Sequence, residues 1–501
     1  MPDTTDRFAW HPEPQLLDVR DADVSRAALE DLGRQAWATA LDYLYDEAFR
    51  RAMGEPAGYA DLRARFFGST GGPAAAPTTP AATADLLAEF TERIAPHNLN
   101  SWHPRALSYF TPPPLMISIV GELLAQVINQ GVDVWHAGPA AAFVEEEVIR
   151  WLCDLVGYGE GSFGLLASGG VMANFMGMAL ARDIHLRQIL GATTAPRGAA
   201  LENVRVYVSD QAHFSIGRAL DELGFPPETL VAIESDDRFR LRASRVAAAV
   251  HLDRQDGHTP LAIAAVAGST NTGSVDQIPE LADLAEREGL WLHIDAAYGG
   301  AARLSARDAH RVPDLHRADS VTIDPHKWFF QAYDIGGLLV RDGRQLALTF
   351  SRSPEYYGAG GELDYYKLGF EGTRRFRALK LWMSWKSLGT EGFGRLIDMN
   401  DDVAAYLARR IRESDDFEMT PDEPELSVVC FRHVSGVAAD DLDAHQHRLQ
   451  VALEATGDGW LSTTTLRGST WLRAGVVNYM TTERDIDRLL DTLRAVAPRS
   501  T

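Results

Sequence analysis

The chain has 501 residues, of which 46% are hydrophobic and 24% are charged, and its formal net charge at pH 7 is −22. This length exceeds what one hydrophobic core usually organises, so two or three domains of a soluble globular protein are expected. The negative charge disfavours binding to nucleic acids or to anionic membranes. No apolar run is long enough to span a bilayer and no signal-peptide core follows Met1, so a cytoplasmic location is predicted.

Residues 1–97 are expected to form a helical arm. Apolar side chains recur at helical spacing through 14–52, and a stretch rich in Gly, Ala, Pro and Thr follows at 68–84. That composition cannot pack as a regular element and predicts a connector. Residues 98–389 are then predicted to form a large domain and 390–501 a small C-terminal α+β domain.

Strands and helices alternate through the predicted large domain. Short apolar runs predict buried strands before Ser168 and at 204–208, 261–267, 290–294 and 320–323. This alternation is typical of an α/β fold with a doubly wound, mainly parallel sheet. Each strand is followed by a polar or glycine-rich turn. Because ligands bind at the carboxyl edge of such sheets, these turns predict one shared site.

Lys327 is the strongest candidate for a chemical role. Pro325 stops the strand at 320–323, so Lys327 lies just past its carboxyl end, and Trp328 follows. Apolar surroundings lower the pKa of an amine and make it a nucleophile that can hold an aldehyde cofactor as a Schiff base. The alternative is a surface lysine whose stem packs on Trp328.

Three other turns carry candidate cofactor contacts. The turn at 168–170 (Ser-Gly-Gly) joins a strand to a helix, where free N–H groups favour a phosphate, although it can equally be a tight connection. Asp295 ends a buried strand, where a carboxylate needs a cation such as a protonated pyridine nitrogen, or else caps a helix. His213 can lie on the face of a cofactor ring, or be satisfied by hydrogen bonds within its loop. The cysteines, Cys153 and Cys430, are predicted to be reduced packing residues, and no metal ion is predicted.

Together these motifs resemble the pyridoxal-phosphate-dependent group II amino-acid decarboxylases, particularly aromatic-L-amino-acid decarboxylases, which have the aspartate-aminotransferase fold (fold type I). The resemblance runs from His103 to the carboxyl terminus. It rests on Ser168-Gly-Gly, Ala212-His213, His293-Ile-Asp-Ala-Ala-Tyr298, Asp324-Pro-His-Lys-Trp328 and the run from Gly372 to Lys380. It implies an enzyme that releases carbon dioxide from an L-amino acid and leaves an amine.

The resemblance also implies a role for each site residue. Lys327 would bind the aldehyde of pyridoxal 5'-phosphate, Asp295 its pyridine nitrogen, and His213 and Ala297 its two ring faces. Thr270 would lie near the ring substituents. Further cofactor contacts, mainly to the phosphate, would come from Ser168, Gly169, Gly170, Val171, Asp324 and His326.

Tyr356 matches the loop tyrosine that returns a proton to the substrate α-carbon in this family. The resemblance further implies an obligate homodimer whose active site lies at the subunit interface, with the N-terminal arm wrapping the partner. An aldehyde synthase on the same fold is a rival, but it commonly has phenylalanine at this position, so Tyr356 and His213 argue against it. A degenerate cofactor-binding protein without turnover is disfavoured by the intact Lys327 and Asp295.

The substrate is less determined by the sequence. Tyr109 and Phe110 match pocket residues of aromatic-specific relatives and favour an aromatic L-amino acid. Asp133 lies near a position where those relatives have larger apolar residues, so a polar, hydroxylated or diamino substrate stays open. Two other residues differ from the family pattern. Ser101 stands at the place of a pocket tryptophan, and Val171 stands where a hydroxyl side chain is common.

Overall fold

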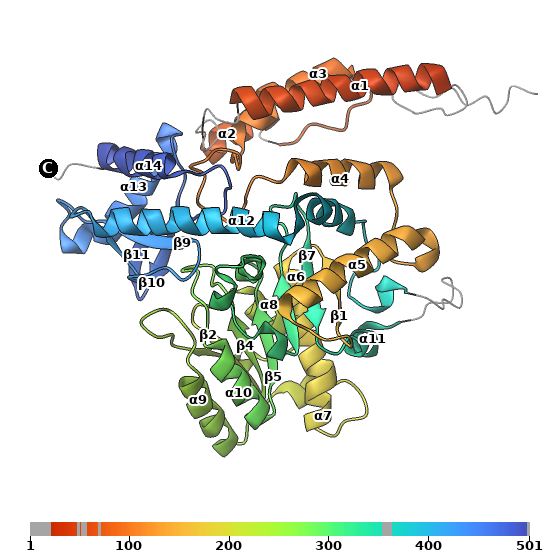
Figure 1. The fold of residues 1–501 in the computed structure, drawn as a ribbon, viewed down its shortest axis with the longest axis vertical. Coiled ribbons are helices and arrows are strands. Elements are labelled where there is room, and N and C mark those ends of the chain that lie inside the picture. Colours follow the sequence, from red (N-terminus) through yellow and green to blue (C-terminus); the bar gives the residue numbers. More distant parts are fainter. Residues whose placement is uncertain (1–21, 48–50, 52–57, 69–71, 353–362, 498–501) are drawn as a thin grey trace, which may run out of the picture. The chain divides into compact units, whose positions relative to one another are not determined.

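The computed structural model describes residues 22–47, 51, 58–68, 72–352 and 363–497 (Figure 1). The chain divides into two compact units, residues 1–106 with 453–460 and residues 107–452 with 461–501. The predicted boundary after residue 97 lies inside the first unit, and the second unit contains most of both the predicted large domain and the predicted C-terminal domain. The three-part division therefore stays a prediction.

The regular elements of the first unit are helices, as far as its residues are described. Its helices are α1 (Ala22–Asp42), α2 (Tyr59–Phe67) and α3 (Thr83–Glu89). Residues 72–82 contain no helix or strand, as the composition of the connector predicts.

Within the described residues, the second unit is built on a seven-stranded sheet with the order β1-β7-β6-β5-β4-β2-β3. The parallel strands are β2 (Val204–Ser209), β3 (Leu230–Ile233), β4 (Thr259–Val266), β5 (Trp291–Asp295) and β6 (Ser320–Ile323). β7 (Gly336–Val340) pairs antiparallel with both β6 and β1 (Phe163–Ala167). The predicted α/β class with a mainly parallel sheet is confirmed, although the sequence reasoning missed β3 and β7.

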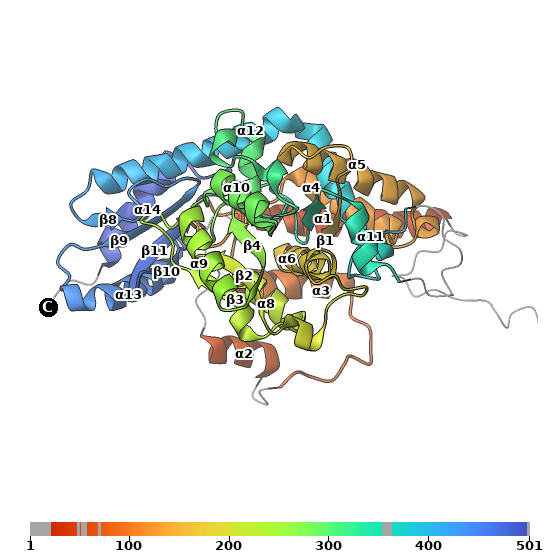
Figure 2. The same ribbon diagram turned by 90° about the horizontal axis from the view of Figure 1, so that it is seen from below.

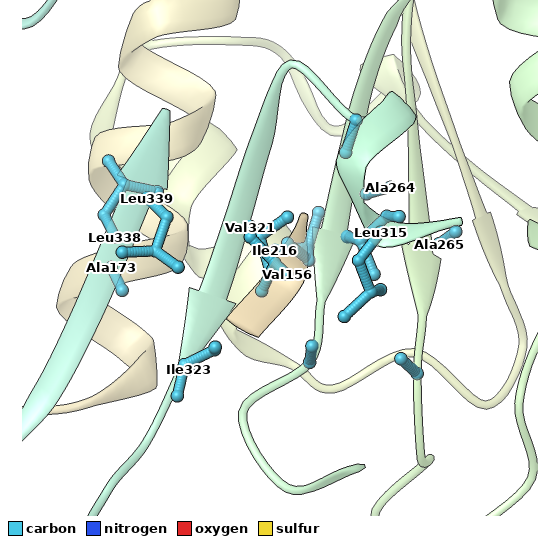
Figure 3. Close-up of a cluster of buried hydrophobic side chains, with 14 of the residues drawn as sticks. Val156, Ala173, Ile216, Ala264, Ala265, Leu315, Val321, Ile323, Leu338 and Leu339 are labelled. Carbon is cyan, nitrogen blue, oxygen red and sulfur yellow. The ribbon is translucent and has the colours of Figure 1, made fainter. Parts of the chain in front are cut away.

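Helices cover both faces of this sheet (Figure 2). Every residue of β5, β6 and β7 is buried, which is why these strands are almost continuously apolar rather than alternating. Figure 3 shows part of the resulting core, with Ala173, Ile216, Val321 and Leu338 among its side chains. The helices around the sheet are α4 (Met116–Ile128), α5 (Pro139–Val156), α6 (Gly170–Leu180), α7 (Arg187–Ile189), α8 (Ser215–Glu222), α9 (Ala243–Gln255), α10 (Ile278–Glu288) and α11 (Arg344–Phe350).

The C-terminal part contains an antiparallel sheet with the order β10-β11-β9-β8. Its strands are β8 (Phe417–Met419), β9 (Val428–His433), β10 (Ser462–Leu466) and β11 (Ser469–Gly475), and its helices are α12 (Ala378–Arg412), α13 (Leu442–Thr456) and α14 (Glu483–Val496). α12 begins at Ala378 and therefore crosses the predicted boundary between the large and the C-terminal domain at residue 390. It continues past Gly389, whose φ of 65° breaks the helical geometry and hides the continuity from the sequence pattern.

The cysteines and the helices show two further features that the sequence predicts. Cys153 and Cys430 are both free and buried, as predicted for packing residues. Over the ranges that the structure describes, none of the helices combines the length and the apolar character needed to traverse a bilayer.

Candidate active site

A cavity of about 380 Å³ lies at the carboxyl edge of the seven-stranded sheet. Its lining comes from the turns after β1, β2, β4, β5 and β6, so the five turns singled out in the sequence meet at one place. Every residue predicted to contact the cofactor lines it, from Ser168 in the first turn to Lys327 in the last. Asn174, Phe214 and Tyr298 also line the cavity, and the sequence reasoning did not propose them.

The turn after β1 is tightly enclosed. α6 begins at Gly170 and has no side-chain cap, so the N–H groups of its first turn are available to an anion. A Cβ atom at Gly170 would lie 2.8 Å from Asp324 Oδ2, and one at Gly169 would lie 3.3 Å from His326 Cε1. Glycine is therefore required at residue 170 by close packing, and the space beside the helix end is kept open.

Lys327 and Asp324 lie in the same turn after β6, and both line the cavity. Its Nζ lies 3.1 Å from Asp324 Oδ2, while Asp324 Oδ1 is buried and has no hydrogen-bond partner among the described residues. Burial lowers the pKa of the Lys327 amine, but the negative charges of Asp324 and Asp295 outweigh this, so the pKa is raised. The predicted lowering of this pKa is thus wrong for the site without its cofactor, because the sequence does not reveal the nearby carboxylates.

Asp295 is buried at the end of β5 and accepts two hydrogen bonds. The backbone N–H of Ala297 donates to Oδ1 at 3.1 Å, and Asn174 Nδ2 donates to Oδ2 at 2.8 Å. The first bond closes the turn after β5, and Asp295 does not cap the following helix, which starts at Gly299. Both donors are neutral and Asp295 also lines the cavity, so its charge remains available to a cationic ligand group.

His213 also lines the cavity and is held through its Nδ1 atom. The backbone N–H of Ser215 donates to this nitrogen at 3.4 Å, and the Ser215 hydroxyl lies 2.8 Å from it. Since Nδ1 accepts a hydrogen bond, a neutral His213 carries its proton on Nε2. Burial lowers the pKa of His213, partly opposed by Asp295, so the neutral form is favoured at pH 7.

His326 shows the same arrangement beside the glycine turn. The backbone N–H of Ile335 donates to its Nδ1 at 3.2 Å, which leaves the proton of a neutral ring on Nε2, 3.8 Å from Asp324 Oδ2. Burial lowers the pKa of His326. The ring can therefore offer one N–H group next to the N-terminus of α6.

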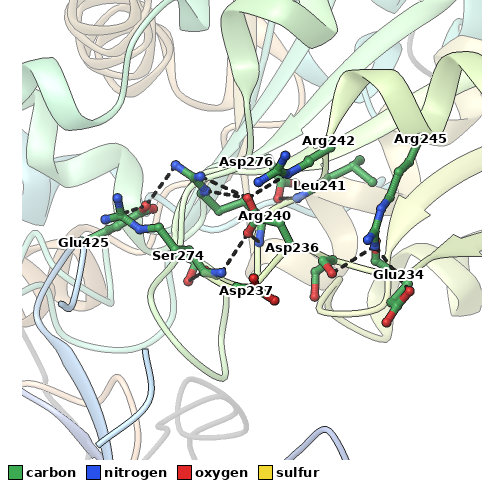
Figure 4. Close-up of polar contacts among 12 residues, drawn as sticks. Glu234, Asp236, Asp237, Arg240, Leu241, Arg242, Arg245, Ser274, Asp276 and Glu425 are labelled. Atoms are coloured by element: carbon green, nitrogen blue, oxygen red, sulfur yellow. Dashed lines mark hydrogen bonds and ion pairs between the residues drawn. The ribbon is translucent and has the colours of Figure 1, made fainter. Parts of the chain in front are cut away.

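The turn after β4 contributes Gly268 and Thr270 to the lining and is anchored by the polar network in Figure 4. The carboxylate of Asp276 accepts the backbone N–H groups of Leu241 and Val266, both at 2.7 Å. Glu425, before β9, accepts the N–H of Val275 at 2.6 Å. These bonds fix both the start and the end of the turn.

Arg473 on β11 is a further candidate that the sequence reasoning missed. Its Nε donates to the Thr270 carbonyl at 2.7 Å and its Nη1 donates to the Ser108 carbonyl. Its Nη2 is buried and finds no hydrogen-bond partner in the part of the chain that the structure describes. Burial lowers the pKa of this guanidinium. An arginine within the apolar strand at 469–475 was the signal that could have identified it.

The three predicted substrate contacts do not line the cavity. Phe110 is buried and stacks on the cavity residue Tyr298, with ring centroids 3.9 Å apart. The Tyr109 side chain is 60% exposed, and Asp133 is half-buried. Their contacts with a substrate stay predictions. Tyr356 lies outside the described residues.

The arrangement fits pyridoxal phosphate. The uncapped end of α6, with glycines that no Cβ could replace without close contacts, suits the phosphate. The Asp295 carboxylate suits a protonated ring nitrogen, and the Lys327 amine suits the aldehyde.

Comparisons with known proteins agree with this assignment. The family model for the pyridoxal-dependent decarboxylase conserved domain matches residues 69–434. The chain is 35% identical over 403 residues to the aromatic-L-amino-acid decarboxylase of Bacillus atrophaeus, covering 79% of this chain and 81% of that protein. It is 31% identical over 420 residues to the L-2,4-diaminobutyrate decarboxylase of Rhizobium meliloti (strain 1021), covering 83% and 82%. The crystal structure of Oryza sativa TDC with PLP and tryptamine has the same fold, with a TM-score of 0.87, 24% identity and coverage of 96% and 99%.

Proposed function

Because the chain belongs to the pyridoxal-dependent decarboxylase family, it is a pyridoxal-phosphate-dependent amino-acid decarboxylase, and we propose that its substrate is an aromatic L-amino acid. The main observation in favour of an aromatic substrate is a group of aromatic side chains at the cavity. Tyr298 lines the cavity and is stacked between Phe110 at 3.9 Å and Trp328 at 4.9 Å. Phe214 lines another part and leaves 58% of its surface exposed, so it offers a ring an apolar contact.

The proposed contributions of the side chains follow from their positions. When bound, pyridoxal phosphate supplies the electron sink for the electron pair left behind as carbon dioxide departs. Lys327 binds the cofactor aldehyde, and the negative charge of Asp295 keeps the ring nitrogen protonated. Neutral His213 lies on the ring face. The first turn of α6 and the Nε2–H of His326 bind the phosphate.

Arg473 is proposed to bind the carboxylate of the substrate. It is a buried cation beside Thr270 with one nitrogen that lacks a hydrogen-bond partner within the described residues. A charged guanidinium N–H group forms a strong hydrogen bond to a carboxylate, and Nη2 would supply it here. Contact with Arg473 would orient the bond to the departing carboxylate while the apolar rings exclude water.

A homodimer is proposed as the working form. On α4, Leu123, Val127 and Ile128 leave 62%, 74% and 52% of their surface exposed. Neighbouring apolar side chains this exposed on one helix are typical of a protein–protein interface. A second copy of the chain is the occupant that family membership supports.

A second candidate substrate is a diamino acid. The half-buried Asp133 could pair with a second amino group, and the relative from Rhizobium meliloti is a diaminobutyrate decarboxylase. The test is carbon dioxide and amine release from L-tryptophan, L-tyrosine, L-phenylalanine, L-2,4-diaminobutyrate and L-glutamate. We expect kcat/KM to be at least about tenfold higher for an aromatic substrate, the discrimination that a fitted apolar pocket provides. Fastest turnover of diaminobutyrate would replace the proposal with the second candidate, and aldehyde as main product would favour a synthase.

A further inference from the structure

Asn174 on α6 lies in the cavity wall and joins several buried polar groups. Its side chain is nearly inaccessible, with 1% of the residue surface exposed. Its Nδ2 donates to Asp295 Oδ2 and to Ser215 Oγ, both at 2.8 Å. Its Oδ1 accepts from the hydroxyl of Thr322 at 2.7 Å and lies 2.9 Å from Nε2 of His293. All the hydrogen-bonding capacity of one amide is thus used within the protein interior.

The negative charge of Asp295 determines which groups donate and which accept hydrogen bonds in this network. An ionised carboxylate only accepts hydrogen bonds, so the amide of Asn174 must turn its NH₂ group toward Asp295. Its oxygen then faces His293, which carries its proton on Nε2. Burial lowers the pKa of His293 to about 4, so the ring stays neutral and its Nδ1 accepts from the Ser320 hydroxyl at 2.8 Å.

The other branch reaches His213. Ser215 Oγ receives an N–H group of Asn174, so its own O–H is left to donate to His213 Nδ1 at 2.8 Å. This agrees with the backbone N–H of Ser215, which can only donate to the same nitrogen. Asp295 and His213, both in the cavity wall, are therefore connected through two neutral side chains.

A glycine on α6 makes room for this network. Gly177 lies one turn after Asn174, and a Cβ atom there would be 2.7 Å from Cε1 of His293. The absence of a side chain at residue 177 allows the His293 ring to approach α6 and contact Asn174. A residue with a Cβ would push the ring away or displace the helix.

We propose that Asn174 is a positioning residue that holds the Asp295 carboxylate in one orientation and keeps the proton of His213 on Nε2. The cofactor's ring nitrogen and ring face would then meet groups whose orientation and protonation are fixed before binding. This inference rests on the proposed contact between Asp295 and the ring nitrogen. Asn174 acts only through Asp295 and His213.

The first test compares pyridoxal phosphate with its 1-deaza analogue, in which a C–H group replaces the ring nitrogen. Dissociation constants are measured by absorbance for the cofactor-free wild type, Asn174→Ala and Ser384→Ala. Ser384, on α12, is a matched control. Its buried hydroxyl donates to Gln331 Oε1 at 3.1 Å and takes no part in the network around Asn174. The wild type should prefer pyridoxal phosphate by about a hundredfold, as expected for a buried charge pair. Asn174→Ala should reduce this ratio about tenfold, the effect of one hydrogen bond to a charged group, while Ser384→Ala should keep it.

The outcomes separate the inference from the proposed function. A ratio that changes less than threefold in Asn174→Ala overturns the positioning role, and an equal change in Ser384→Ala shows a general loss of stability instead. A wild type without any preference overturns the contact between Asp295 and the ring nitrogen itself.

A second measurement reads the position of the His213 proton directly in the wild-type protein. Nitrogen-15 NMR of histidine-labelled wild-type protein should show His213 as the Nε2–H form at pH 7, with its signal assigned from His213→Gln. Ser215→Ala should increase the Nδ1–H fraction and leave the preference for pyridoxal phosphate unchanged. If the wild-type signal is that of the Nδ1–H form, the direction of the network is wrong and the proposal fails.

Discussion

The carboxylate of Asp324 lies 3.1 Å from the amine of Lys327, and the two residues are three positions apart in the chain. This pair keeps the amine protonated in the site without its cofactor, because the attraction of the carboxylate outweighs the effect of burial. An ammonium group cannot attack an aldehyde. We therefore expect Asp324 to influence how readily the protein takes up its cofactor.

Replacing Asp324 with asparagine should accelerate cofactor uptake at pH 8. Without the negative charge the pKa of Lys327 falls, so a larger fraction of the amine is deprotonated at that pH. The pH profile of uptake, followed by absorbance, should shift to lower pH. Asp364→Asn is the control, since Asp364 pairs with Lys367 at 2.8 Å with the same spacing but outside the cavity lining. An unchanged profile in Asp324→Asn would show that the ion pair does not govern uptake.

The same pair gives a stability prediction with a definite sign. The folded-state pKa of Lys327 is raised above its ordinary value of 10.5, so the pair stabilises the protein fully below that pH. The contribution is lost as the pH rises through the raised pKa. The difference in stability between cofactor-free wild type and Asp324→Asn, measured by urea unfolding, should therefore shrink above pH 10.5 and stay constant between pH 7 and 9.

Lys327→Ala should abolish turnover and the covalent label that borohydride leaves on the protein in the presence of pyridoxal phosphate. The competing amine is Lys380, a buried lysine whose pKa burial lowers to about 7. Lys380 does not line the cavity, so position rather than basicity should decide the site of labelling. Mass spectrometry that locates the phosphopyridoxyl group on Lys380 would contradict the assignment.

Asp295→Asn should retain the cofactor but lower kcat at least about a hundredfold, equivalent to about 3 kcal/mol of transition-state stabilisation. The amide preserves the shape of the side chain but cannot hold a proton on the ring nitrogen. Turnover numbers corrected for bound cofactor measure this effect. A rate within a few-fold of wild type would mean that Asp295 does not contact that nitrogen.

Glutamate at both Leu123 and Val127 should convert the dimer into monomers. Charges on this face of α4 would have to be buried against the partner, which is unfavourable without compensating cations. Light scattering coupled to size exclusion gives the mass directly. Leu252→Glu serves as the control, because Leu252 on α9 is similarly exposed at 59%. A monomeric wild type would rule out the proposed assembly.

Tyr356→Phe should change the product without stopping the release of carbon dioxide. This expectation rests on the sequence resemblance, in which the phenol returns a proton to the α-carbon. Without that donor, dissolved oxygen competes for the carbanion and aldehyde replaces part of the amine. Tyr357→Phe should behave like the wild type. Aerobic product analysis of both variants would reveal a misplaced assignment if only Tyr357→Phe formed aldehyde.

Local sequence patterns were sufficient to predict the five turns of the candidate site, because each turn directly follows an apolar strand and contains polar residues or glycines. Local patterns could not predict the properties of a residue whose main contacts come from segments far away in the sequence. The pKa of Lys327 depends on Asp295, and the importance of Asn174 depends on strands more than a hundred positions later. β7 was missed because its Gly-Gly-Leu-Leu-Val run is short and closely follows the lysine motif. The arginine within the apolar run at 469–475 was visible in the sequence, but its contact with Thr270 was not, because the two residues are 203 positions apart.

The place of β7 in the sheet has a consequence for the order of folding. Every described residue that lines the cavity precedes residue 328, yet β1 has β7 as its only strand neighbour. A Cβ atom at Gly336, the first residue of β7, would lie 2.4 Å from Cα of Gly169. The turn at 168–170, which we propose binds the phosphate, therefore cannot reach its final position until β7 has emerged and inserted between β1 and β6. Because such pairing between distant segments is slow, recovery of cofactor binding should be a late kinetic phase of refolding.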